Sequence, residues 1–405
     1  MIIARIWDAI NDPMFGAIAE RTNTKRGRFR PYIFYGAPFL ALSAVLTFTT
    51  IGGRGAAIYA AVTYIAYGML YTVVNLSYGS LSTVMTMNPE DISQLTSWRM
   101  MGTNLSAVVL SALSPVILGA ISKGSTFTGT SYTITILIYA ICQVPLFYFV
   151  YAECKEVVKP INEGVKIPVS MSLKAVVTNK PLMLIFAMMV FQMFGFFGRM
   201  GVVVYYIIYV LQKPQMIGIF MALPSIMTVI GILLTKNFIL KLGKKKVTAI
   251  GYIGAGISLI VMYLTPASDI PVMILLHALY GFFCFSFPIP MSMTPDAINY
   301  QEDRIGIRTD GMAYAAVSLS TKIGNAIGPA VALIIMGAFG YVANAQQTAA
   351  SMQGINLSTN LIFGISYLLA LIPLAFYPLN EQKNAAITDS LNRKRDEKAK
   401  EKTKL

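Results

Sequence analysis

Long runs of apolar residues, broken by short charged or Gly/Pro-rich segments, recur from one end of the chain to the other. Each run is close to the roughly 20 residues that an α-helix needs to cross a bilayer. The pattern predicts eleven such helices, over residues 1–19, 32–52, 57–87, 100–121, 131–152, 181–211, 215–239, 247–265, 270–294, 311–340 and 356–379. We therefore expect an all-α polytopic membrane protein whose membrane domain is nearly the whole chain.

The composition supports this class and argues against others. Of the 405 residues 56% are hydrophobic and only 12% are charged, which leaves too little polar surface for a soluble protein. The net charge of +14 does not indicate nucleic-acid binding, because the basic residues sit in short loops and a tail. We find neither a metalloprotease HExxH string nor a nucleotide-binding glycine loop, so we expect no enzyme and no cofactor beyond a coupling ion.

The basic residues are distributed unevenly between alternate loops. Of the 32 Lys and Arg residues, 25 lie in segments 20–31, 88–99, 153–180, 240–246, 295–310 and 380–405. Cytoplasmic loops of membrane proteins carry this excess of Lys and Arg. We therefore expect these segments, the C-terminus included, to be cytoplasmic, and the protein to be a multi-pass protein of the cell membrane.

A charged, proline-containing segment at 153–180 divides five predicted helices from six. We expect an N-terminal bundle over 1–152, a cytoplasmic linker over 153–180, a C-terminal bundle over 181–379 and a disordered basic tail over 380–405. Parallel repeats of six helices each would give this arrangement if one further helix preceded residue 1, as in the major facilitator superfamily.

Two acidic residues, Asp8 and Asp12, fall inside a predicted transmembrane helix. Four residues apart, they share one helix face. Two carboxylates repel each other unless a cation lies between them or one is protonated, so this pair with Asn11 suits Na⁺ or H⁺. The alternative is that Asp8 pairs with Arg5 while Asp12 caps a turn broken at Pro13.

The positions of four basic or titratable residues on other helices have two interpretations each. Lys322 faces a central cavity or reaches the cytoplasmic interface along its stem. Arg99 faces that cavity or anchors a helix end, and Arg199 faces it or forms a structural pair. His277, the only histidine, is a packed or hydrogen-bonded core residue or a proton relay, and we expect the core residue.

Several strings resemble one transporter family. The string from Arg5 to Pro13, with Trp-Asp-Ala-x-Asn-Asp-Pro within it, resembles the second helix of the glycoside-pentoside-hexuronide:cation symporters. Glu20-Arg21 and Arg26-Gly-Arg-Phe-Arg-Pro31 resemble the loop that follows it. Asn75-Leu-Ser-Tyr-Gly-Ser-Leu81, Gly306-Ile-Arg-Thr-Asp-Gly311 and Lys322-Ile-Gly extend the resemblance over essentially the full length.

This resemblance implies a major facilitator fold and assigns roles to particular residues. It implies a coupling-cation site formed by Asp8, Asn11, Asp12 and Thr72. The carboxylates of Asp8 and Asp12 are the candidate ligands if the cation is Na⁺. It implies that substrate binding or gating involves Asn75, Tyr78, Arg99 and Lys322. Melibiose-type members carry aspartate at position 75 and tryptophan at position 79, so this chain is more similar to the pentoside and hexuronide branch.

The resemblance implies a secondary transporter that couples a sugar, glycoside, pentoside or hexuronide to Na⁺ or H⁺ by alternating access. The alternatives are a non-transporting remnant of the same fold and an antiporter or exporter of the superfamily. Charges of the first loop, at Glu20, Arg21, Arg26 and Arg28, either close a cytoplasmic gate with counterparts around Lys241 to Lys246 or only set the topology.

Overall fold

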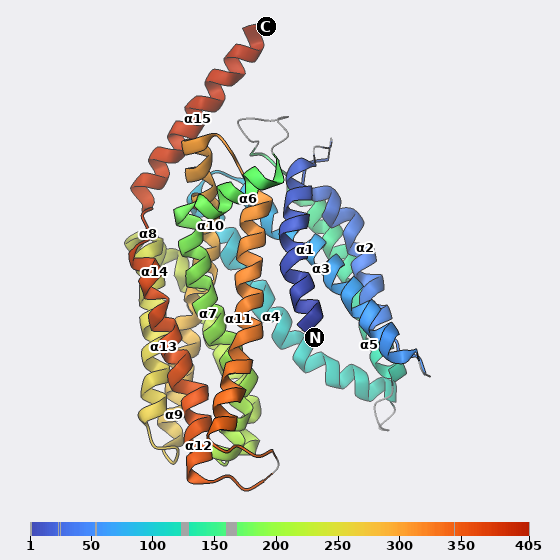
Figure 1. Cartoon of the computed structure of the whole chain (residues 1–405), viewed down its shortest axis with the longest axis vertical. Helices are drawn as coiled ribbons and strands as arrows, with labels where there is room; N and C mark the ends of the chain where they lie inside the picture. Colours follow the sequence, from blue (N-terminus) through green and yellow to red (C-terminus); the bar gives the residue numbers. More distant parts are fainter. Residues whose placement is uncertain are drawn as a thin grey trace.

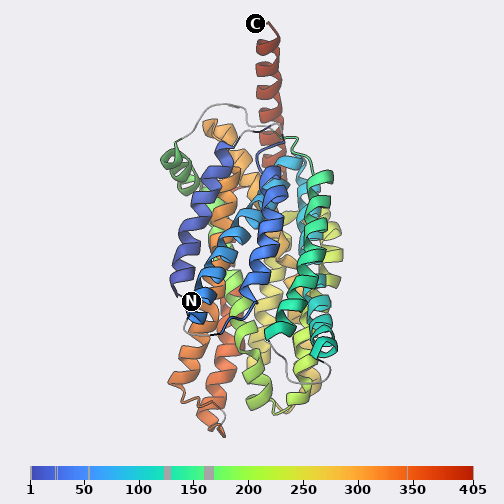
Figure 2. The same ribbon diagram turned by 90° about the vertical axis from the view of Figure 1, so that its right-hand side faces the viewer.

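Helices make up most of the computed structural model and form two groups that lie side by side (Figure 1). The structure describes residues 2–22, 24, 26–52, 55–122, 129–158, 168–343 and 345–404. Within these ranges it describes the side chains of all residues except 2–10, 20, 89, 107–108, 111–112, 115, 169 and 398–404. One long helix at the C-terminus extends beyond both groups, as the perpendicular view also shows (Figure 2).

The first group contains helices at each of the five positions that the apolar pattern predicts. They are α1 (Ile2–Arg21), α2 (Arg30–Thr47), α3 (Ala56–Met85), α4 (Pro89–Ser122) and α5 (Gly129–Glu153). Phe15 of α1, Phe29 before α2 and Leu81 of α3 pack together in a small buried core. This core ties α1, α2 and α3 to one another, and Ala315 of α11 also belongs to it.

A glutamate after α5 fastens the first loop. The Glu156 carboxylate accepts the backbone N–H groups of Arg28, Phe29 and Arg30 at 2.8, 2.8 and 3.0 Å. These donors lie at the start of α2, where backbone N–H groups lack intrahelical partners and the helix dipole favours an anion. The predicted linker continues with a short helix, α6 (Val169–Thr178), and its residues 159–167 lie outside the described part.

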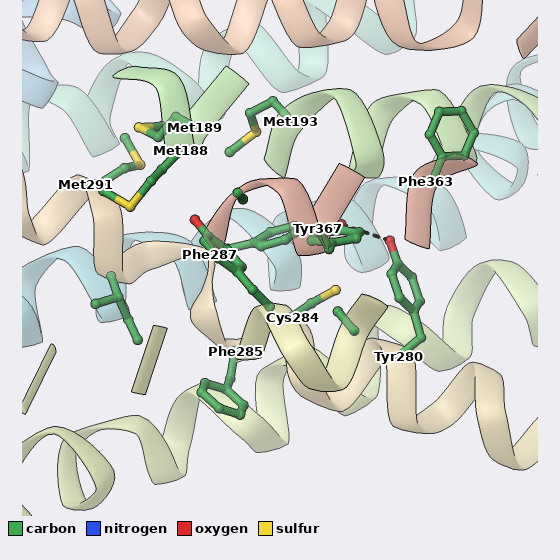
Figure 3. Packing of buried hydrophobic residues seen from close by; sticks show 14 of the residues in the cluster. Met188, Met189, Met193, Tyr280, Cys284, Phe285, Phe287, Met291, Phe363 and Tyr367 are labelled. Atoms are coloured by element: carbon green, nitrogen blue, oxygen red, sulfur yellow. Dashed lines mark hydrogen bonds between the residues drawn. The ribbon is translucent and has the colours of Figure 1, made fainter. Parts of the chain in front are cut away.

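The second group contains the remaining membrane helices. They are α7 (Lys180–Tyr205), α8 (Ile217–Leu264), α9 (Ile270–Phe283), α10 (Pro288–Ile305), α11 (Asp310–Ala338), α12 (Ala349–Asn356), α13 (Ile362–Leu369) and α14 (Leu371–Ala375). Short 3-10 or π-helical turns continue α7, join α9 to α10 and join α12 to α13. Methionines and aromatic rings of α7, α10 and α13 fill its core, where Tyr280 and Tyr367 are hydrogen-bonded (Figure 3).

The chain within α8 turns at Gly243, which has a positive φ of 79°. A side chain there would meet the carboxylate of Glu381, which accepts the N–H of Lys244 at 2.7 Å. Gly27 has the same environment in the first group, with a φ of 106° and the Glu156 carboxylate beside it. The two groups therefore share a loop of the same construction, while the domain boundaries at 152 and 181 stay a prediction.

Seven helical stretches in the described residues are long and apolar enough to cross a membrane. The longest, Pro214–Leu264, has 51 residues and contains the turn at Gly243. Helices α1, α2 and α4 lie at predicted positions but are not among the seven. Polar residues such as Asp12 and Arg99 lie on α1 and α4, and α4 borders the cavity described below.

The prediction of a disordered tail is wrong. Residues Glu381–Lys404 form a helix, α15, whose first turn is capped by the Asn380 side chain accepting from the Lys383 N–H at 2.9 Å. The segment is rich in residues with high helix propensity, and helix propensity does not appear in the apolar periodicity on which the prediction was based. Lys394 and Arg395 bind carboxylates at the end of α10, so tertiary contacts also stabilise it. We call this end of the molecule the α15 end.

Candidate functional site

A cavity of about 510 Å³ lies between the two groups of helices, lined by α3, α4, α7, α10 and α11. Aromatic rings line both sides of it, from Tyr64, Tyr67 and Tyr71 on α3 and from Phe196 and Phe197 on α7. Polar side chains are interspersed with the rings, namely Asn75, Arg99, Thr103, Asn104, Ser318, Thr321, Lys322 and Asn325. Apolar walls with a few convergent polar groups are typical of sites for small organic ligands.

Asp12 is fully buried and pairs with a lysine of the other group of helices. The Lys322 ammonium donates to Oδ1 of Asp12 at 2.7 Å, and the Thr72 hydroxyl donates to the same oxygen at 2.9 Å. Oδ2 of Asp12 has no hydrogen-bond partner among the described residues. The structure thus brings three predicted site residues together, and Lys322 reaches a buried carboxylate instead of the membrane interface.

Asn11 and Asp8, the other two residues of the predicted cation site, have no described side-chain contact with Asp12. Asn11 is buried, and its Nδ2 has no partner among the described residues. The side chain of Asp8 lies outside the described residues, although its backbone belongs to α1. The proposed pairing of Asp8 with Asp12 around a cation therefore stays a prediction.

Arg99 lies in the cavity wall beside two other predicted residues. Its Nη2 donates to Oδ1 of Asn75 at 3.4 Å, and its guanidinium lies 4.9 Å from the centre of the Tyr78 ring. A Cβ at Gly79 would approach Tyr314 to 2.8 Å and Arg99 to 3.3 Å, so a larger residue cannot enter there without displacing them. No carboxylate among the described side chains pairs with Arg99, which leaves its charge facing the cavity.

A buried network of charges joins the two groups above this cavity, at the α15 end. Asp310 accepts from Arg28 at 2.8 Å, from Arg308 at 2.9 Å and from the Thr83 hydroxyl at 2.9 Å. Arg308 also pairs with Glu302 at 2.9 Å and donates to the Thr83 carbonyl at 3.1 Å. Burial alone would lower the pKa of Arg308, but the carboxylates of Asp310 and Glu302 raise it above its ordinary value.

The four predicted gate residues have different environments. Arg28 joins the two groups, through Asp310, whereas Arg26 donates to Tyr35 of its own group at 2.9 Å. Arg21 has an exposed side chain, and the side chain of Glu20 lies outside the described residues. The prediction that Arg28 closes a gate with residues around Lys241 to Lys246 is wrong, because Arg28 pairs with Asp310. Lys244 pairs instead with Asp296 at 2.8 Å, within the second group.

Arg199 and His277 are buried away from the cavity, inside the second group. His277 Nε2 lies 2.7 Å from the Phe220 carbonyl, so Nε2 carries the proton and Nδ1 accepts from Arg199 at 3.1 Å. The Arg199 guanidinium also lies 4.7 Å from the centre of the Tyr280 ring. The prediction of a hydrogen-bonded core histidine is confirmed. Of the two interpretations of Arg199, the structure agrees with the structural pair and not with a side chain that faces the cavity.

Sequence reasoning missed Asp310, Arg308, Glu302 and Thr83 as site residues. It placed the three charged residues in a loop, where charges need no special explanation. The only available signal was the string Gly306-Ile-Arg-Thr-Asp-Gly311, which was recognised without a role. Their burial depends on the arrangement of α3, α10 and α11, which local sequence does not show.

Comparisons with known proteins show similarity to membrane transporters of sugars and glycosides. A family model described as "MFS/sugar transport protein" matches residues 1–381. The chain is 32% identical over 391 residues to the uncharacterized symporter YnaJ of Bacillus subtilis, covering 94% of this chain and 83% of that protein. It is 28% identical over 406 residues to the glucuronide carrier protein homolog of Escherichia coli, covering 98% and 87%.

The fold is similar to that of a solved transporter. The structure of the transporter FucP in the outward conformation matches with a TM-score of 0.67 at 13% identity, covering 93% of this chain and 88% of that one. At this identity the match shows the major facilitator fold, which the sequence predicts.

Proposed function

Because this chain belongs to the MFS/sugar transport protein family, we propose that it carries a sugar or glycoside through its central cavity, coupled to Na⁺ or H⁺ at Asp12. The protein is a multi-pass membrane protein and not an enzyme. The observation that supports coupling most strongly is the buried Asp12 carboxylate, which has one oxygen on Lys322 and the other without a partner among the described residues.

The pair between Asp12 and Lys322 supplies a physical basis for coupling. A carboxylate at bilayer depth is costly unless a positive charge or a proton compensates it. In this structure Lys322 compensates Asp12 and joins α1 to α11. A coupling cation or proton at Asp12 would compete with Lys322, and would release a contact between the two groups of helices. Cation binding therefore biases the equilibrium between the states of alternating access.

The cavity charges favour an acidic sugar within this function. Lys322 is neutralised by Asp12, whereas Arg99 has only the Asn75 amide and the Tyr78 ring as described partners. A carboxylate on the sugar would give Arg99 a bidentate partner, while the aromatic walls would pack against the sugar ring. We propose a hexuronide or similar acidic glycoside as the substrate, a class that the name of the glucuronide carrier protein homolog also contains.

The orientation is part of the same proposal. The α15 end carries the loops that hold most of the Lys and Arg residues, so the positive-inside rule places it in the cytoplasm. The buried network then closes the cytoplasmic side, and substrate enters the cavity from outside.

The coupling test is uptake of a labelled glucuronide into proteoliposomes with and without an imposed Na⁺ or pH gradient. We expect one of the two gradients to drive accumulation, and Asp12→Asn to abolish accumulation because it removes the titratable, cation-binding group. Asp91→Asn is the matched control, since Asp91 is exposed at the start of α4. Accumulation by Asp12→Asn equal to that of the wild type would refute the cation site.

The substrate test is a comparison of a methyl glucuronide with its uncharged methyl ester. We expect Asn75→Asp to weaken binding of the acid by about tenfold or more, because a carboxylate 3.4 Å from Arg99 would compete with the ligand for it. Binding of the ester should change much less. Equal effects on both ligands would reject Arg99 as the acid-binding group and leave the coupling proposal intact.

A further inference from the structure

A second hollow, of about 270 Å³, lies outside the central cavity, between α4 of the first group and α8 of the second. One face of α4, from Glu90 to Met101, forms one wall, and one face of α8, from Ile232 to Leu240, forms the other. We call it the α4–α8 groove. Trp98 and Leu240 in its walls are 63% and 54% exposed, so in a membrane the groove is open to lipid.

Each wall carries one charged side chain, Glu90 on α4 and Lys236 on α8. Both side chains are exposed. Among the described residues neither forms an ion pair, with each other or with a third residue, although both line the same groove. A carboxylate and an ammonium that stand apart across an apolar groove are complementary to a ligand that carries both a cation and an anion.

The two charges lie at different depths from the α15 end. Glu90 is the second residue of α4, whose start is near α15, because Arg395 of α15 donates to Met87. Lys236 precedes the turn at Gly243, also at this end, by seven residues. At 1.5 Å per helical residue this places Lys236 about 10 Å below the turn. The carboxylate is therefore the outer charge and the ammonium the inner one.

We propose that the α4–α8 groove binds a zwitterionic phospholipid with a primary-ammonium headgroup, such as phosphatidylethanolamine. In this headgroup the ammonium is farther from the acyl chains than the phosphate, which is the order that Glu90 and Lys236 require. The apolar residues deeper in the groove, with the exposed ring of Trp98, contact the acyl chains. A choline headgroup has no N–H to donate to Glu90, and an anionic glycerol headgroup brings no cation to it.

This lipid would act as a clamp between the two groups of helices. It contacts α4 and α8 on the half of the molecule that the buried Asp310 network closes. If the groove exists only in that closed state, the lipid stabilises the state by its differential affinity. The inference concerns a site separate from the sugar cavity, so it holds or fails independently of the proposed substrate.

The test is native mass spectrometry of the full chain with phosphatidylethanolamine, phosphatidylcholine or phosphatidylglycerol of identical acyl chains. We expect the first lipid to be retained about tenfold more strongly than the other two, because only it pairs with both charges. Glu90→Gln should remove the preference over phosphatidylcholine, and Lys236→Gln should weaken retention of all three lipids.

The double variant Glu90→Lys with Lys236→Glu is the decisive control. It keeps the net charge and the two side-chain types but reverses their order in depth, so we expect it to lose the preference. Asp91→Asn is a second control, because Asp91 is next to Glu90 but does not line the groove. Equal thermal stability of the variants in phosphatidylcholine verifies folding. A double variant that still prefers phosphatidylethanolamine, or a wild type without any preference, would overturn the proposal.

Discussion

We predict that the ion pair between Arg28 and Asp310 helps to keep the α15 end closed in the proposed transport cycle. It joins the loop before α2 to the start of α11, and its side chains are 14% and 0% exposed. Arg28→Gln removes one charged hydrogen bond between the groups and leaves the bonds from Arg308 and Thr83 to Asp310 in place. A hydrogen bond to a charged group contributes roughly 1.5–3 kcal/mol. A loss of about 2 kcal/mol would raise the ratio of open to closed molecules about thirtyfold.

Ser318→Cys, in the cavity wall, can report this ratio, while the native Cys284 is buried. Cys142 and Cys154, which are not buried, are first replaced by serine. A membrane-impermeant maleimide is then added from the α15 side of oriented vesicles. While most molecules are closed, the labelling rate follows the open fraction, so Arg28→Gln should raise the rate by up to about thirtyfold.

Arg26→Gln is the matched control for this experiment. Arg26 is two residues away in the same basic loop, and its guanidinium contacts Tyr35 and Phe34 of its own group. It changes the surface charge by the same amount without touching Asp310, so its labelling rate should equal that of the wild type. Equal rates for the two variants would refute the assignment of Arg28 to the closed gate.

Three further predictions concern packing and α15. Gly16→Val should abolish transport and lower thermal stability, because even a Cβ at this position would lie 2.9 Å from the Gly311 carbonyl; Gly16→Ala should have a smaller effect of the same sign. Arg395→Gln should destabilise the docking of α15 more than Lys394→Gln, since Arg395 meets the buried Glu302 while the Lys394 pair is largely exposed, and hydrogen exchange of α15 would measure both. His277→Phe should lower the melting temperature and leave lipid retention unchanged, because it removes the acceptor for a buried guanidinium far from the groove.

The helices themselves were predictable because lipid imposes a simple rule on sequence. A spanning segment must satisfy its own backbone and present apolar side chains, so length and hydropathy locate it. The turn inside α8 shows the rule working at fine scale, since Gly243 with its lysines separates two apolar runs that are otherwise continuous. The tail shows its limit. Outside the membrane, helix propensity and contacts such as that of Lys394 with Asp303 determine whether a helix forms, and apolar periodicity does not predict it.

Site residues were predictable where a charge stood out against an apolar background. Asp12 and Lys322 did so, and the structure joins them at 2.7 Å. Asp310 and Arg308 did not, because at a helix end a charge costs little and therefore signals little. Some of their partners lie more than 200 residues away in sequence, as Thr83 does from Asp310, and only the packing of the two groups brings these together.

Hydrogen bonds between the two groups of helices are concentrated toward one end of the described structure. Among the side chains that the structure describes, the hydrogen bonds between the groups start at the mid-membrane pair of Asp12 and Lys322 and continue toward the α15 end, through Ser82 with Tyr314, to the Asp310 network. In the proposed transport cycle, rocking of one group against the other would break these contacts, and the Asp12–Lys322 pair is the farthest of them from the α15 end. A cation or proton at Asp12 would shift the balance between the proposed states only because it competes with Lys322, whose ammonium binds that carboxylate in this structure and joins α1 to α11.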